Sequence, residues 1–153
     1  MGEFNSMLRQ WYEAEVAGAA FFGAMARGAK VEAEAAKWTL LGRLEATMAE
    51  QLGKTCAAES IDVPAESPRA SELLAYAQSL EGKSWQAIME DMMPQLKDAV
   101  VEVQNETSQA PPDHAELAAR FMAHEEALAA FVTAEVEGDD GSPAIDSLLC
   151  EWA

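Results

Sequence analysis

The segment 121-FMAHEEALAAF-131 repeats apolar side chains at the spacing of one face of an α-helix. The repeating positions, separated by three, four and three residues, are Phe121, His124, Leu128 and Phe131. Glu125 borders this stripe, whereas Glu126 is turned toward solvent. A buried ionisable group must be neutralised, hydrogen-bonded, paired or bound to a metal. The segment therefore predicts a helix that carries a polar site on its core face.

The rest of the chain also has a helical composition. Ala, Glu, Leu, Met and Gln are abundant, and no segment alternates polar and apolar residues as a half-buried strand does. The pattern predicts long helices over residues 7–27, 31–52 (ending at Gly53), 84–107 and 113–137, and short helices over 68–80 and 142–152. The predicted fold class is all-α.

Local signals set several helix boundaries. Ser67 before Pro68 is typical of an N-cap followed by proline at the first helical position. Asp113, with Glu116 three residues later, predicts a capping box at the start of another helix. Pro94 lies inside a predicted helix and should kink it.

The lengths of the connections indicate how the four long helices are joined. The first pair and the last pair are each tightly connected, so each pair should form an antiparallel hairpin. About thirty residues separate the pairs, enough to travel the length of a helix of about 33 Å. These lengths predict a four-helix bundle with a long crossover between helices 2 and 3 and a short C-terminal helix. An up-down-up-down bundle with a decorated middle loop is the alternative.

The overall composition limits the domain count and the class of partner. The first six residues, MGEFNS, resemble a cloning-vector remnant, which leaves residues 7–153 as one helical domain. The formal charge of −17 argues against nucleic acid and anionic membranes as partners. Solubility is the simplest explanation of this acidity. A saline habitat or a cationic partner is the more specific alternative explanation. Cys56 and Cys150 form no metal-binding or redox motif, and reduced thiols in a cytoplasmic protein are the expectation.

Two more helices carry an acidic residue on their apolar stripe. Glu15 lies between Trp11 and Phe22, and Glu45 lies between Leu41 and Met48. Together with the polar residues of segment 121–131, three helices each bring an ionisable side chain inward about midway along their length. The sequence predicts that these side chains meet at one place.

These positions resemble a known family. Glu15 followed seven residues later by Phe22 is similar to the first helix of rubrerythrin-like ferritin proteins, and Glu45 with Met48 occupies the place of that family's Glu-x-x-His motif. The resemblance covers roughly residues 7–137. It implies a ferritin-like fold with a carboxylate-bridged di-iron site and oxidase, oxygenase or peroxidase chemistry.

The ligand set is incomplete compared with that family. A complete site takes a Glu from each of two helices and Glu-x-x-His from each of the other two. The chain has two histidines, His114 and His124, preceded at the third position by Pro111 and Phe121, so it contains no Glu-x-x-His. Met48 stands in place of a histidine, and its thioether is a poor ligand for iron.

The remaining candidate metal ligands are Glu15, Glu45, His124 and Glu125. They suit one divalent ion of iron, manganese or zinc with open coordination positions. A metal-free network in which these side chains satisfy one another is equally compatible, and an unconventional dinuclear site or a small-molecule pocket are further alternatives. The functional prediction is a ferritin-like protein of unassigned role with a partial carboxylate and histidine site. Whether it is an enzyme stays open. The alternative is a non-catalytic interaction protein that forms a homodimer through exposed helix faces.

Overall fold

The computed structural model describes residues 2–153 and is helical. Six α-helices and one 3₁₀ turn make up its regular structure, and these described residues contain no β-strand. The prediction of an all-α chain is confirmed. No helix within residues 2–153 has both the length and the apolarity that a membrane span requires.

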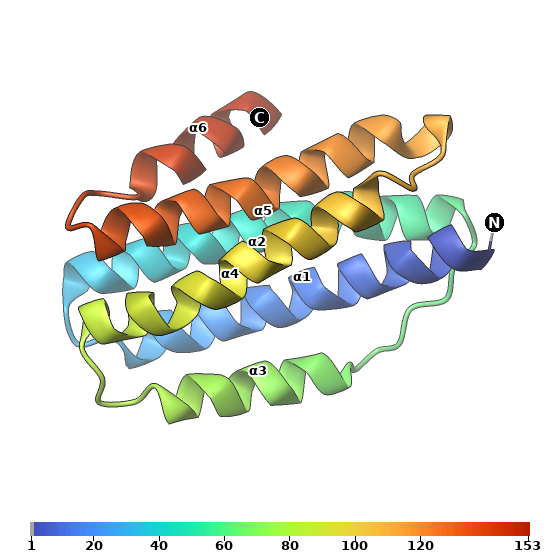
Figure 1. Cartoon of the computed structure of the whole chain (residues 1–153). Coiled ribbons are helices and arrows are strands. Elements are labelled where there is room, and N and C mark those ends of the chain that lie inside the picture. Colours follow the sequence, from blue (N-terminus) through green and yellow to red (C-terminus); the bar gives the residue numbers. More distant parts are fainter. Residues whose placement is uncertain (1) are drawn as a thin grey trace. The chain divides into compact units, whose positions relative to one another are not determined.

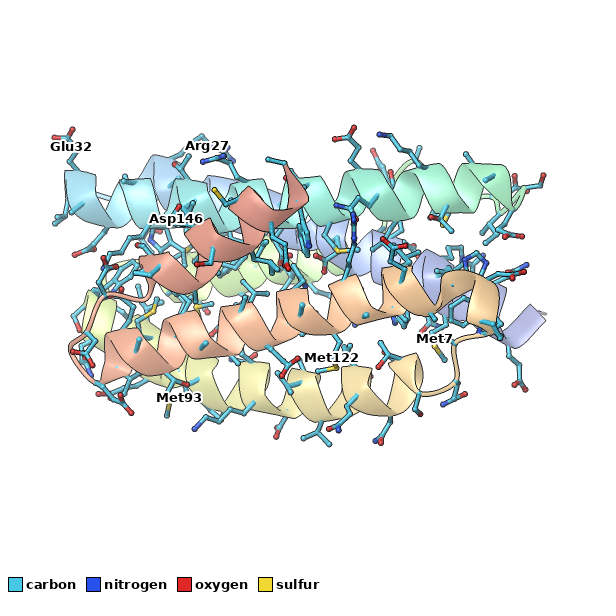
Figure 2. All side chains as sticks on the ribbon, turned by 90° about the horizontal axis from the view of Figure 1, so that it is seen from above. Met7, Arg27, Glu32, Met93, Met122 and Asp146 are labelled. Atoms are coloured by element: carbon cyan, nitrogen blue, oxygen red, sulfur yellow. The ribbon has the colours of Figure 1, made fainter. Side chains whose placement is uncertain are left out.

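The chain divides into two compact units, Met1–Glu81 and Gly82–Ala153. This division does not test whether residues 7–153 fold as one domain. The single-domain expectation therefore stays a prediction. In the first unit, helices α1 (Gly2–Gly28) and α2 (Glu32–Ala58) form an antiparallel hairpin (Figure 1). Arg27, at the end of α1, and Glu32, at the start of α2, accordingly lie at the same end of the unit, and Met7 lies toward the other end (Figure 2).

Helix α3 (Pro68–Ser79) lies beside α1 in the first unit and runs in the same direction (Figure 1). Phe21 near the end of α1 stacks on Tyr76 near the end of α3, with ring centroids 5.5 Å apart. Phe22 stacks in turn on Trp38 of α2 at 5.9 Å. Each such aromatic pair adds about 0.5–1.5 kcal/mol beyond the area that it buries. This cluster therefore fixes both α2 and α3 to the same end of α1.

The second unit is built from a second antiparallel hairpin. Helix α4 (Trp85–Thr107) is followed by the 3₁₀ turn η1 (Pro112–His114), by α5 (Ala115–Val136), and by α6 (Ser142–Trp152), which folds back along α5 (Figure 1). The carboxylate of Glu135 on α5 connects this helix to the start of α4 and to the residue before α6. It accepts a hydrogen bond from Trp85 Nε1 at 2.9 Å and one from the backbone N–H of Gly141 at 2.8 Å.

Two helices of the first unit are longer than the sequence predicted. Helix α1 begins at Gly2 rather than Met7, and the buried ring of Phe4 packs edge-on against Trp11 at 5.8 Å. Helix α2 continues past Gly53, which was predicted to end it, as far as Ala58. A Cβ at Gly53 would lie 3.1 Å from the Tyr12 ring, so this glycine serves close packing rather than helix termination.

The capping predictions had mixed outcomes. As predicted, Ser67 caps α3 by accepting from Arg69 N at 3.2 Å. Ser84, the predicted first residue of the next helix, is its N-cap and accepts from Ala87 N at 3.1 Å. The predicted capping box of Asp113 and Glu116 is wrong. Because η1 includes Asp113, the N-cap of α5 shifts to His114. Helix α4 runs continuously through Pro94, and the kink expected there stays a prediction.

Candidate metal centre

The first unit contributes Glu15, which lies on the core face of α1. It follows Trp11 by one helical turn and precedes Gly18 by another, and its side chain is only 2 % exposed. The 3.6-residue period that places Trp11 and Phe22 in the core also places Glu15 there. The sequence prediction that Glu15 is buried is confirmed.

Glu45 of α2 reaches the same part of α1. Its side chain is 5 % exposed, and a Cβ added at Gly18 would collide with its Oε1 atom. Glycine in a helix interior costs about 1 kcal/mol relative to alanine. At position 18 the missing methyl group leaves the space that the Glu45 carboxylate occupies against the α1 backbone.

The two carboxylates of this unit form a buried pair. A carboxylate oxygen of Glu15 and one of Glu45 lie within 4.8 Å of each other. Two negative charges at that separation repel by about 3 kcal/mol at an effective dielectric constant of 20. Burial adds to this cost because both groups lose water. A proton, a hydrogen-bond donor or a cation near the Glu15–Glu45 pair lowers this cost.

The second unit contributes a buried imidazole beside a third carboxylate. His124 is fully buried in α5, and its ring stacks on Phe121 with centroids 5.7 Å apart. Its Nδ1 lies 3.6 Å from Oε1 of Glu125, which is 9 % exposed. In metal sites, a carboxylate beside one ring nitrogen commonly orients a histidine that binds the metal through the other nitrogen.

The structure thus brings the four predicted residues together as two pairs, Glu15 with Glu45 and His124 with Glu125. Each pair lies within one unit, and the neighbouring Glu126 is exposed as predicted. The predicted role of Glu125 as a metal ligand stays a prediction, since its observed partner is His124.

Sequence reasoning missed one buried acid, Glu135, which is 6 % exposed. It follows Phe131 by four residues and Leu128 by seven, so the helical period that revealed His124 also places Glu135 on the core face. Its carboxylate is hydrogen-bonded to Trp85 and Gly141. Glu135 therefore has a structural explanation that requires no metal.

The comparisons with known proteins give no relative for this chain. No protein-family model, no curated protein and no solved structure matches it.

Proposed function

We propose that the protein is a ferritin-like helical-bundle metalloprotein that binds one divalent ion, of iron, manganese or zinc. Glu15, Glu45 and His124 are the proposed ligands. Glu125, whose carboxylate lies beside the imidazole of His124, is available as a fourth ligand. The observation that carries the proposal is the buried Glu15–Glu45 pair, whose mutual repulsion a divalent cation would remove.

The position of each ligand along its helix supports a shared centre. Glu15 is the middle residue of the 27-residue α1, and Glu45 is the middle residue of the 27-residue α2. His124 lies near the middle of α5, which spans 22 residues. In ferritin-like bundles the metal ligands likewise project inward from several helices.

The chemistry of the donor atoms supports one metal ion rather than two. Two carboxylates and one imidazole offer three protein ligands, which leaves coordination positions for water or substrate. Hard carboxylate oxygens favour iron, manganese or zinc over soft ions. A second iron would need the Glu-x-x-His motifs that this sequence lacks, and the buried Met48 offers a thioether in that place. Bound iron or manganese would give the centre a redox-active ion able to react with dioxygen or peroxide.

The proposal fits the side chains around the carboxylate pair. Gly18 provides room for Glu45 where any larger residue would displace its carboxylate. The Glu125 carboxylate lies 3.6 Å from His124 Nδ1, which is longer than a hydrogen bond but close enough for electrostatic attraction. The space at Gly18 positions one of the proposed ligands before the metal arrives.

Elemental analysis of protein purified without chelator, before and after loading with Fe²⁺, Mn²⁺ or Zn²⁺, tests the proposal. We expect about one metal ion per chain in the wild type. Glu45→Gln and His124→Gln should each lower the affinity by at least tenfold. Glu135→Gln is the matched control for a buried acid and should retain the metal. A chain that remains metal-free after loading with each ion would refute the proposal.

One observation favours a second candidate function. The His124–Glu125 pair forms a charged contact within the second unit once the imidazole is protonated, and such a pair needs no metal. The chain would then be a non-catalytic interaction protein whose core polar groups are structural. In that case metal loading leaves the melting temperature unchanged, while His124→Ala still destabilises the fold.

A further inference from the structure

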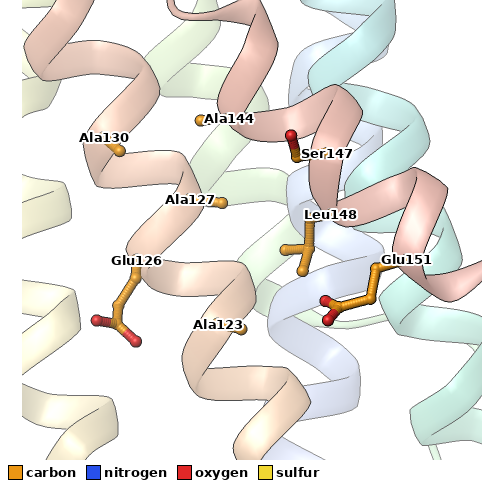
Figure 3. A pocket seen from close by; sticks show the side chains of 8 residues that line it. All are labelled: Ala123, Glu126, Ala127, Ala130, Ala144, Ser147, Leu148 and Glu151. Atoms are coloured by element: carbon orange, nitrogen blue, oxygen red, sulfur yellow. The ribbon is translucent and has the colours of Figure 1, made fainter.

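The second unit contains a groove between α5 and α6, separate from the proposed metal ligands (Figure 3). Its volume is about 530 Å³, within the range of small-molecule sites. Alanine side chains form much of its wall, and Leu148 of α6 projects into it (Figure 3). The buried Ala127 and Leu148 form its apolar floor.

The groove exists because α5 presents small side chains where α6 packs beside it. Ala123, Ala127 and Ala130 are spaced by four and three residues, so they share one helix face. Gly141 lets the start of α6 lie close to α5, because a Cβ at this position would collide with the backbone of Phe131. Since alanine methyl groups are short, the space beyond them stays open.

The charges at the groove define what it can bind. Glu126 of α5 and Glu151 of α6 are its charged residues, both are exposed, and no Lys, Arg or His lines it within the described residues 2–153. The unit as a whole carries 15 acidic and three basic side chains over residues 82–153, a formal charge of −12. Such a field attracts cations and repels anions.

We propose that this groove binds a small organic cation with an apolar body, of the alkylammonium class. The alkyl part lies on the alanine and Leu148 floor, and the cationic head lies at the rim with Glu126 and Glu151. A second copy of the chain is a poorer occupant, because its own acidic groove would place like charges against these carboxylates. The site is independent of the metal centre.

Hexyltrimethylammonium is a suitable probe, with binding measured by isothermal titration calorimetry in EDTA at low salt. The wild type should bind it at millimolar concentration or below, and more weakly as salt is added. Glu126→Gln and Glu151→Gln should each weaken binding by about two- to fivefold, as expected for exposed ion pairs. Ala130→Leu should abolish binding by filling the groove, and it should fold normally because Ala130 is exposed.

The controls separate this site from general acidity and from the metal centre. Asp146 is an exposed acid of α6 that does not line the groove, so Asp146→Asn should bind the probe with less than a twofold change. Glu45→Gln should also leave binding unchanged. The proposal is overturned if the probe does not bind, if hexan-1-ol binds as tightly as the cation, or if Ala130→Leu binds like the wild type. It is also overturned if Ala130→Leu converts a wild-type dimer into a monomer, because a second copy then occupies the groove.

Discussion

Gly18→Ala isolates the contact that shapes the carboxylate pair. Alanine normally stabilises a helix interior relative to glycine, by about 1 kcal/mol. At position 18, however, the new methyl group would occupy the place of Glu45 Oε1. We therefore expect a substitution that favours helix formation to destabilise this protein.

The magnitude follows from two opposing terms. Overfilling a packed interior costs about 1–3 kcal/mol, and the gain in helix propensity offsets about 1 kcal/mol of that cost. The expected net change is a loss of about 0–2 kcal/mol in the free energy of unfolding. Gly42→Ala on α2 is the matched control, because its Cβ would lie at an ordinary 3.6 Å from Phe22 Cβ. That variant should gain up to about 1 kcal/mol.

Urea unfolding followed by far-UV circular dichroism, in EDTA, measures both variants. Gly18→Ala should be less stable than Gly42→Ala by about 1–3 kcal/mol. In a Glu45→Ala background the same Gly18→Ala change should become stabilising, since the colliding carboxylate is gone. If Gly18→Ala alone stabilises the chain as much as Gly42→Ala does, the Glu45 carboxylate does not lie against α1 at Gly18.

Three further predictions concern the metal, the Glu135 contacts and the thiols. Metal at about 100 times its dissociation constant should stabilise the fold by about 2.7 kcal/mol. The melting temperature should therefore rise by roughly 5–10 °C, and Glu45→Gln should remove this rise. Glu135→Ala should lower the free energy of unfolding, followed by circular dichroism, by about 2–4 kcal/mol, because two hydrogen bonds to its carboxylate are lost. Glu137→Ala, at an exposed position, should change the free energy of unfolding by less than about 0.5 kcal/mol. Burial raises the pKa of the Cys56 thiol, so iodoacetamide should label the exposed Cys150 well before Cys56, and equal rates by mass spectrometry would contradict this.

The sequence predicted which residues are buried because burial on a helix follows its period. Glu15, Glu45 and His124 were each placed on a core face by spacing alone, and each is buried. Glu135 obeys the same rule, since it follows Phe131 by four residues on the same face of α5.

Features that depend on contacts between helices were not predictable in this way. Gly53 has the composition signal of a helix end, but Tyr12 of α1 approaches it closely and the helix continues. No local pattern marks Gly18 as special, whereas the structure shows that it makes room for Glu45. Asp113 failed as a cap because a 3₁₀ turn shifts the start of α5 by one residue. A single sequence does not encode such shifts in a local pattern.

X-ray absorption spectroscopy of the zinc- or manganese-loaded protein is the decisive test of the proposal that Glu15, Glu45 and His124 bind one metal ion. We expect a shell of oxygen and nitrogen donors at about 2.0–2.2 Å with the scattering signature of one imidazole. That signature should disappear in His124→Gln and persist in His114→Gln, since these are the two histidines of the chain. A wild-type spectrum without imidazole, or one that His124→Gln leaves unchanged, would show that His124 does not bind the metal.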